Sequence, residues 1–181
     1  MARPARELHE GIYHVTAHGS DARYLFLADE DRKDFLARLA AVCEGFELAL
    51  LSWVLLGSHY HALLRIPDAR LSCALQRLHT GYSRRLNKRS NRTAHLFRAH
   101  PSTTLIESDS HLVAAARYLA LNPVEAGIAK NAFDWPWSSA RAHAGLERPM
   151  IPLAENDLKT AFASRTDWRH EYVTALEAPR S

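Results

Sequence analysis

The sequence predicts an α+β protein in which helices pack on one face of an antiparallel sheet, connected as a split βαβ unit of the ferredoxin-like or RRM-like kind. Short apolar runs typical of strands are separated by longer runs at helical spacing. Gly57-Ser58 supplies a turn between two of the strand-like runs, as in a hairpin. A parallel doubly wound fold would need a glycine-rich phosphate loop, which the sequence lacks.

Four strands are expected in chain order. The first covers residues 11–17, which are rich in β-branched and aromatic side chains. Residues 48–56 and 60–66 form the hairpin, one on each side of its turn, and residues 102–106 form a further strand. This arrangement accounts for the antiparallel sheet.

Three long helices are expected between and after the strands. Residues 29–44 begin with an acidic first turn, and residues 71–89 carry an apolar stripe of Leu71, Leu75, Leu78, Tyr82 and Leu86. A third helix begins at Asp109 or Ser110 and should stop near Asn122-Pro123, because proline disfavours helical backbone in the residue before it. Residues 131–181 should form short helices and loops around Trp135-Pro136-Trp137.

Composition limits the class of protein. A chain of 181 residues with 47% hydrophobic content is long enough for one core. No apolar run is long enough to span a membrane and the N-terminus lacks the apolar segment of a signal peptide, so we expect a cytoplasmic protein without membrane contact. Cys43 and Cys73 lie in apolar helical surroundings without metal-type spacing, which predicts two buried free thiols.

The stretch His59-Tyr60-His61 indicates a metal site. Side chains two residues apart on a strand point to the same face, so both imidazoles would project together while Tyr60 packs on the other side. Such a pair can present two nitrogen ligands to one divalent cation. The alternative is a pair of ordinary surface histidines. A nucleotide hydrolase of the histidine-triad class is excluded, because it needs a third alternating histidine at position 63, where Leu63 stands.

A basic segment indicates a nucleic-acid partner. No acidic residue occurs between Asp68 and Glu107, and such a stretch attracts a phosphate backbone through counterion release. Aromatic and histidine side chains interleaved with the charges could stack on unpaired bases. The alternative is a solvated helix face. The candidate DNA-binding residues are Arg77, Arg84, Arg85, Lys88, Arg89, Arg92 and Arg98.

Tyr118 and Asn122 are spaced i and i+4, so they share one face of the third expected helix. Its core stripe is separate and is formed by Leu112, Ala116 and Leu119. Tyr118 therefore has a hydroxyl available for chemistry. The alternative for Tyr118 is a side chain that packs over the helix edge with its hydroxyl in water, and the alternative for Asn122 is a residue that only terminates the helix.

These motifs together resemble the single-tyrosine HUH transposases, and most closely the REP-associated tyrosine transposases. The resemblance runs from about Gly11 to Ala144 and rests on three ordered motifs: His59-Tyr60-His61, the segment from Tyr118 to Gly127, and Trp135-Pro136-Trp137-Ser138-Ser139. One departure is Ser58, where family members more often carry Asn. The resemblance implies an HUH endonuclease domain over residues 1–145, followed by a helical tail over residues 146–181.

The resemblance also implies an activity. His59, His61 and Asn122 would hold Mg²⁺ or Mn²⁺, and Tyr118 would be the nucleophile of a single-stranded DNA endonuclease and strand transferase acting on hairpins through a 5′-phosphotyrosine. The protein would be a monomer or a homodimer. Three alternatives stay open: Tyr82 as nucleophile, a structural zinc site that adds His95, His100 or Cys73 to the histidine pair, and a domesticated protein that binds hairpin DNA without cutting it.

Overall fold

The computed structural model describes residues 8–20, 24–90, 95–98, 100–162 and 167–178. Its centre is one antiparallel sheet in the order β2-β3-β1-β4. The strands are β1 (Gly11–His18), β2 (Ala49–Leu55), β3 (His59–Ile66) and β4 (Ser102–Ile106). The predicted α+β class, the hairpin and all four strands are therefore confirmed.

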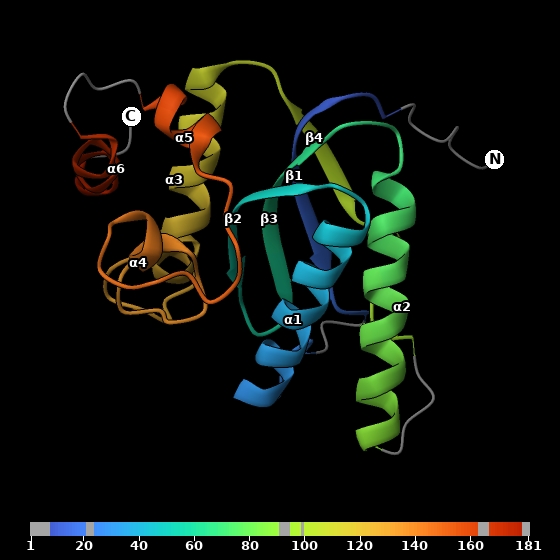
Figure 1. The fold of residues 1–181 in the computed structure, drawn as a ribbon. Helices are drawn as coiled ribbons and strands as arrows, with labels where there is room; N and C mark the ends of the chain where they lie inside the picture. The colour runs from blue at the N-terminus through green and yellow to red at the C-terminus, as the bar shows by residue number, and fades with distance from the viewer. Residues whose placement is uncertain (1–7, 21–23, 91–94, 99, 163–166, 179–181) are drawn as a thin grey trace.

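Helices cover both faces of this sheet, as Figure 1 shows. α1 (Asp29–Gly45) and α2 (Leu71–Ser90) lie on one face, and α3 (Asp109–Glu125) lies on the other. The prediction of helices on one face is wrong. The reason is visible in the central strands: Leu64 packs into the core beneath α1 and α2, whereas its neighbour Leu63 packs into the core beneath α3. Uninterrupted apolar runs of this kind require cover on both sides.

The core between the sheet and α1 and α2 contains the predicted apolar stripe of α2. Tyr82 belongs to this core, because its side chain is 1% exposed and its hydroxyl donates to the backbone carbonyl of Leu25 at 2.6 Å. A tyrosine in this position cannot reach a substrate. Cys43 is buried as predicted, but Cys73 lies on the solvent side of α2 and is exposed, so that part of the cysteine prediction is wrong.

α3 differs from its prediction at both ends. Its N-cap is Ser108, whose hydroxyl accepts a hydrogen bond from the backbone N–H of His111 at 3.2 Å. The helix continues through Pro123 to Glu125. Pro123 has no N–H to donate to the preceding turn, but the helix still closes after it, because Ala126 donates its backbone N–H to the carbonyl of Asn122 at 2.9 Å. Tyr118 and Asn122 therefore both sit on regular helix.

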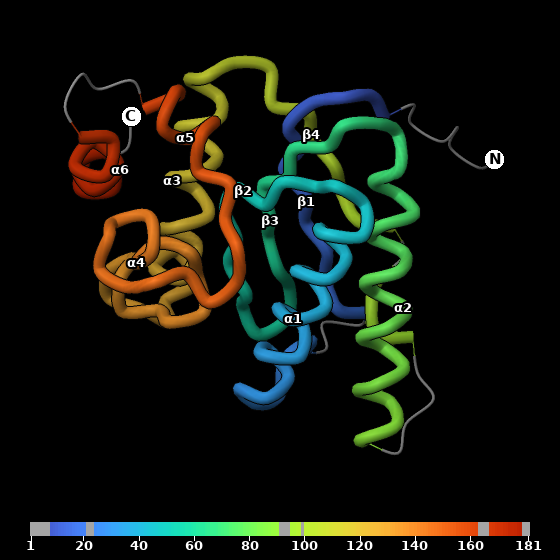
Figure 2. Tube along the Cα trace, viewed as in Figure 1, coloured from blue at the N-terminus to red at the C-terminus, as the bar shows by residue number. Residues whose placement is uncertain are grey.

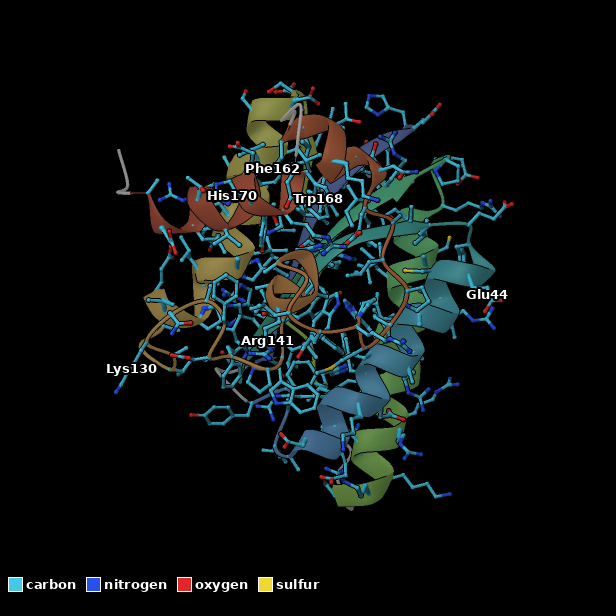
Figure 3. The ribbon with its side chains drawn as sticks, turned by 60° about the vertical axis from the view of Figure 1, so that its left-hand side comes forward. Glu44, Lys130, Arg141, Phe162, Trp168 and His170 are labelled. Carbon is cyan, nitrogen blue, oxygen red and sulfur yellow. The ribbon has the colours of Figure 1, made fainter. Side chains whose placement is uncertain are left out.

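The C-terminal segment packs on α3 and the sheet edge. It contains the short helices α4 (Ala140–His143), α5 (Asn156–Ala161) and α6 (Trp168–Glu177). Figure 3 labels Phe162 and Trp168 on the side of the molecule where α3 lies, and both residues belong to the core around that helix. Arg65 of β3 and Asp157 of α5 form an ion pair that fastens this segment to the sheet. Among the described residues, no helix is long and apolar enough to cross a membrane.

One end of the sheet brings together segments that are distant in the sequence. The β2–β3 turn and the C-terminal end of α2 both lie at this end, as the tube in Figure 2 shows. The last residues of β1 reach the same end, because His18 pairs with His59 across the two strands. Residues 95–98, which follow α2, pair with the end of β1: Arg98 donates its backbone N–H to the carbonyl of His18 at 2.8 Å. We call this the hairpin end of the sheet.

Candidate functional site

The two histidines of β3 project from the sheet face that α3 covers. Tyr60 between them points to the opposite face, where it is fully buried and its hydroxyl lies 2.9 Å from Nε2 of His79. The rings of His59 and His61 are 5.1 Å apart and nearly perpendicular. The predicted projection of both imidazoles to one side is confirmed by this geometry.

β1 adds two more histidines that the sequence reasoning did not include. His18 lies directly across from His59, and their rings stack with centroids 4.7 Å apart. His14 lies beside His61, with 5.1 Å between ring centroids. The signal was present in the sequence, because His14, Thr16 and His18 alternate along a strand and therefore share one face. It could be read only once β1 was known to pair with β3.

His61 is held in one orientation by its neighbours. Its Nδ1 lies 2.9 Å from the Thr16 hydroxyl and 2.9 Å from Nε2 of His14. Its other nitrogen, Nε2, is buried and has no hydrogen-bond partner among the described residues. A buried nitrogen without a partner is costly, so this atom is suited to a ligand that supplies the missing interaction.

The electrostatics keep these rings neutral. Burial, together with the neighbouring His14, His59 and His18, lowers the pKa of His61 to about 3. Burial also lowers the pKa of His59, an effect that His18 adds to and a hydrogen bond with Asn122 opposes. Burial and then His111 lower the pKa of His14. A neutral imidazole has a free lone pair, which is the form that binds a metal.

α3 brings the predicted tyrosine and asparagine to these histidines. The Tyr118 ring is 41% exposed and stands edge-on to His61, with 5.4 Å between centroids, and to His14, with 5.9 Å. Asn122, one turn later, is buried and hydrogen-bonds to His59. The two residues therefore face the histidines together, as their spacing predicts.

A cavity of about 580 Å³ separates α3 from the sheet at this point. It stays open because α3 presents the small side chains of Ala114 and Ala115 beside Tyr118. The floor is polar and is built by β1, β3 and β4. The lining residues are His14, Thr16, His18, His59, His61, Ser102, His111, Ala114, Ala115 and Tyr118. An open space with neutral nitrogen ligands and a free phenol can accept a metal-bound phosphate.

The donor set fits a divalent metal held by His59, His61 and Asn122. Within the described ranges, no three His, Cys, Asp or Glu side chains are grouped to hold a metal, and the amide of Asn122, buried and hydrogen-bonded to His59, is the further donor that the structure brings to the histidine pair. The same finding argues against the structural zinc alternative, and Cys73 is exposed on α2, across the sheet. Ser58, the departure from the resembled family, lies beside His59, with its hydroxyl 3.3 Å from Nδ1 of that residue.

The predicted basic residues do not line this cavity. α2 lies on the opposite face of the sheet, and two of its arginines pair with acidic residues of α1: Arg85 with Asp34 at 2.8 Å, and Arg89 with the buried Asp31. Arg77, Arg84 and Lys88 are exposed and form no ion pair with another described residue. Arg98 is exposed next to His18, and Arg92 lies outside the described residues.

The fold can be compared with solved structures. A REP-associated tyrosine transposase bound to a REP hairpin superimposes with a TM-score of 0.70 and 18% sequence identity, over 85% of this chain and 92% of that one. The chain has the fold of a REP-associated tyrosine transposase. The resemblance that the motifs predicted is thus confirmed at the level of the fold. A candidate transposase from Deinococcus radiodurans R1 is more distant, with a TM-score of 0.45 and 15% identity over 62% of this chain and 91% of that one. No family model and no curated protein matches the sequence.

Proposed function

We propose that this protein cleaves and rejoins single-stranded DNA next to a hairpin, with Tyr118 as the nucleophile. One observation carries the proposal. An exposed tyrosine stands edge-on to the buried, neutral His61, which has an unpartnered nitrogen and lies beside the half-buried His59, on a fold shared with a transposase bound to a REP hairpin. Tyr118, His61 and Asn122 all come from one chain, so the proposed site needs no second copy.

The chemistry follows from the tyrosine. The Tyr118 phenol gives up its proton as its oxygen attacks the phosphorus of a DNA phosphodiester and forms an O–P bond. The P–O3′ bond breaks, and the leaving oxygen takes up one proton to become a 3′-hydroxyl. The phosphotyrosine conserves the bond energy, so rejoining needs no nucleotide cofactor. Attack by the released or another 3′-hydroxyl reverses the step and transfers the strand.

The histidines and the amide support this step by binding and orientation. His59, His61 and Asn122 would hold Mg²⁺ or Mn²⁺. When bound, such an ion supplies Lewis-acid polarisation of a non-bridging phosphate oxygen. Thr16 and His14 fix the ring of His61 through Nδ1, which leaves Nε2 aimed at the ligand. All three ligands are uncharged, so they do not repel the phosphate.

The basic residues assist DNA binding in two places. Arg98 lies at the hairpin end of the sheet, beside His18, where it can contact the strand that enters the cavity. α2 also ends there, so Arg84 and Lys88, in its C-terminal half, can contact phosphates that lie beyond the cavity. Arg85 and Arg89 instead hold α2 against α1 through their ion pairs with Asp34 and Asp31.

The test is cleavage of a labelled hairpin oligonucleotide with single-stranded flanks, in the presence of Mg²⁺ or Mn²⁺. His61→Ala should abolish cleavage and leave most of the binding, because the cationic residues supply the affinity. His170→Ala is the matched control, since His170 is exposed on α6 away from the cavity. Cleavage by His61→Ala at the wild-type rate would remove the metal site from the proposal. Binding without cleavage by the wild-type protein would favour a domesticated hairpin-binding protein.

A further inference from the structure

Tyr24 combines an exposed ring with a fixed backbone. Its side chain is 65% exposed, which is unusual for an aromatic residue beside a core. The next two residues are buried: Leu25 is 0% exposed and Phe26 is 2% exposed. Their backbone N–H groups both donate to the carbonyl of Gly57, at 2.8 and 3.2 Å, and the carbonyl of Leu25 accepts from the Tyr82 hydroxyl. The chain therefore holds Tyr24 in place while leaving its ring open to a partner.

Gly57 provides a seat for this ring. A Cβ atom added to Gly57 would lie 2.7 Å from Cδ1 and 2.8 Å from Cε1 of Tyr24. The ring thus packs against the bare backbone of the β2–β3 turn, in a space that only glycine leaves free. The contact is with the Cδ1–Cε1 edge of the ring, and the side chain is otherwise mostly exposed, so the ring is a platform for stacking that is held at one edge.

The platform adjoins the proposed catalytic site. Gly57 precedes His59 by two residues, so their Cα atoms are at most about 7 Å apart. Ser58, between them, contacts His59 through its hydroxyl and accepts a hydrogen bond from the backbone N–H of Gly19. A strand whose phosphate lies at the histidines, and which leaves the cavity toward the hairpin end of the sheet, would reach the exposed Tyr24.

We propose that Tyr24 is a base-stacking residue that receives an unpaired nucleobase of the DNA strand next to the cleaved phosphate. The inference rests on the proposed function and deepens it by assigning a nucleotide subsite. Aromatic rings bind single-stranded nucleic acid because every base has a flat face, so the contact fixes the position of the strand and tolerates different sequences. Arg98 at the same end of the sheet supplies a cation for the backbone of that strand.

The experiment measures binding of a hairpin with single-stranded flanks by fluorescence anisotropy, without metal. Tyr24→Ala should weaken binding roughly tenfold or more, whereas Tyr24→Phe should bind like the wild type, because the ring and not the hydroxyl makes the contact. Leu146→Ala is the control, since Leu146 is a 57% exposed apolar side chain that lies in the segment after α4.

Gly57→Ala tests the seat. Its new methyl group must displace the Tyr24 ring, so it should reproduce the loss seen with Tyr24→Ala. The double variant should be no worse than either single variant, because both remove the same contact. If the two losses add in the double variant, Gly57 acts independently of the Tyr24 ring, and the claim that Gly57 positions this ring is wrong.

Abasic substitutions along the flanks locate the base. At one position, removing the base should weaken wild-type binding as much as Tyr24→Ala does, and should abolish the difference between the two proteins. If Tyr24→Ala binds every oligonucleotide like the wild type, or if no abasic position removes the difference, the stacking role is wrong. In either case, Tyr118-dependent cleavage by the wild type would leave the proposed function standing. A wild-type protein that binds none of these DNAs would overturn both proposals.

Discussion

The arginines of α2 should separate into two groups. Substitution in one group should lower the stability of the fold, and substitution in the other should weaken DNA binding. Arg89 pairs with Asp31, which is 3% exposed and also accepts the backbone N–H groups of Leu27 and Ala28 at the start of α1. Removing Arg89 leaves a buried carboxylate with those two donors and no counter-ion. Loss of a charged hydrogen bond costs about 1.5–3 kcal/mol, and because the Arg89 side chain is 47% exposed we expect about 1–2 kcal/mol. Arg84 is exposed and forms no ion pair with another described residue, so Arg84→Ala should change stability by less than about 0.5 kcal/mol.

Two assays separate these roles. Urea denaturation gives the free energy of unfolding of Arg84→Ala and Arg89→Ala, and DNA binding over a range of salt concentrations gives the number of phosphate contacts. Arg84→Ala should reduce the slope of log affinity against log salt by about 0.7 for a single strand, while Arg89→Ala should change it less. The reasoning is refuted if Arg89→Ala keeps full stability and loses as much slope as Arg84→Ala, because Arg89 would then be held by DNA and not by α1.

Three further predictions concern the histidines. Thr16→Val keeps the shape of the side chain but removes the hydroxyl 2.9 Å from Nδ1 of His61, so Mn²⁺ affinity measured by calorimetry should fall about tenfold; unchanged affinity would show that Thr16 does not position the ring. Asn122→Ala should weaken Mn²⁺ binding less than His61→Ala, since water can replace one amide ligand; the reverse order would contradict the proposed ligand set. Burial lowers the pKa of His61 to about 3 and that of His79 to about 4, so the unfolded chain binds more protons below about pH 6.5. The free energy of unfolding should therefore fall as the pH drops from about 6.5 to about 4, by up to about 1.4 kcal/mol per pH unit for each histidine. Measured by urea denaturation, this fall should be shallower for His79→Phe than for the wild type.

Local sequence signals predicted the elements well, but not the number of layers. Hydrophobic periodicity located the strands and α2, because burial of one face imposes a spacing that the sequence displays. The second helical layer was missed, although the neighbouring residues Leu63 and Leu64, which point to opposite faces of β3, are both buried. α3 and the C-terminal helices were the only segments left to cover the second face. Assigning them to it requires the strand order, which depends on contacts between segments distant in the sequence.

The site was predicted only as far as its local motifs. Strand alternation alone predicts that His59 and His61 share a face, and helical spacing alone predicts that Tyr118 and Asn122 do, whereas the roles of ligand and nucleophile came from the resemblance. His14 and His18 join them because β1 pairs with β3 in one particular register, which the sequence does not specify. The roles of the basic residues were hidden for the same reason, since the pairing of Arg89 with an acidic residue of α1 depends on how two helices pack.

The central claim is that Tyr118 is the nucleophile, and covalent capture of DNA tests it most directly. Wild-type protein mixed with a hairpin oligonucleotide carrying single-stranded flanks, with Mg²⁺ or Mn²⁺, should form a denaturant-resistant adduct through a 5′-phosphate. Tyr118→Phe keeps the ring, so it should remain folded, bind the DNA and form no adduct. Tyr82→Phe is the control and should still form it, because the Tyr82 hydroxyl is buried against the carbonyl of Leu25. An adduct that persists in Tyr118→Phe, or a wild-type protein that binds the hairpin and never forms one with either metal, would contradict the claim.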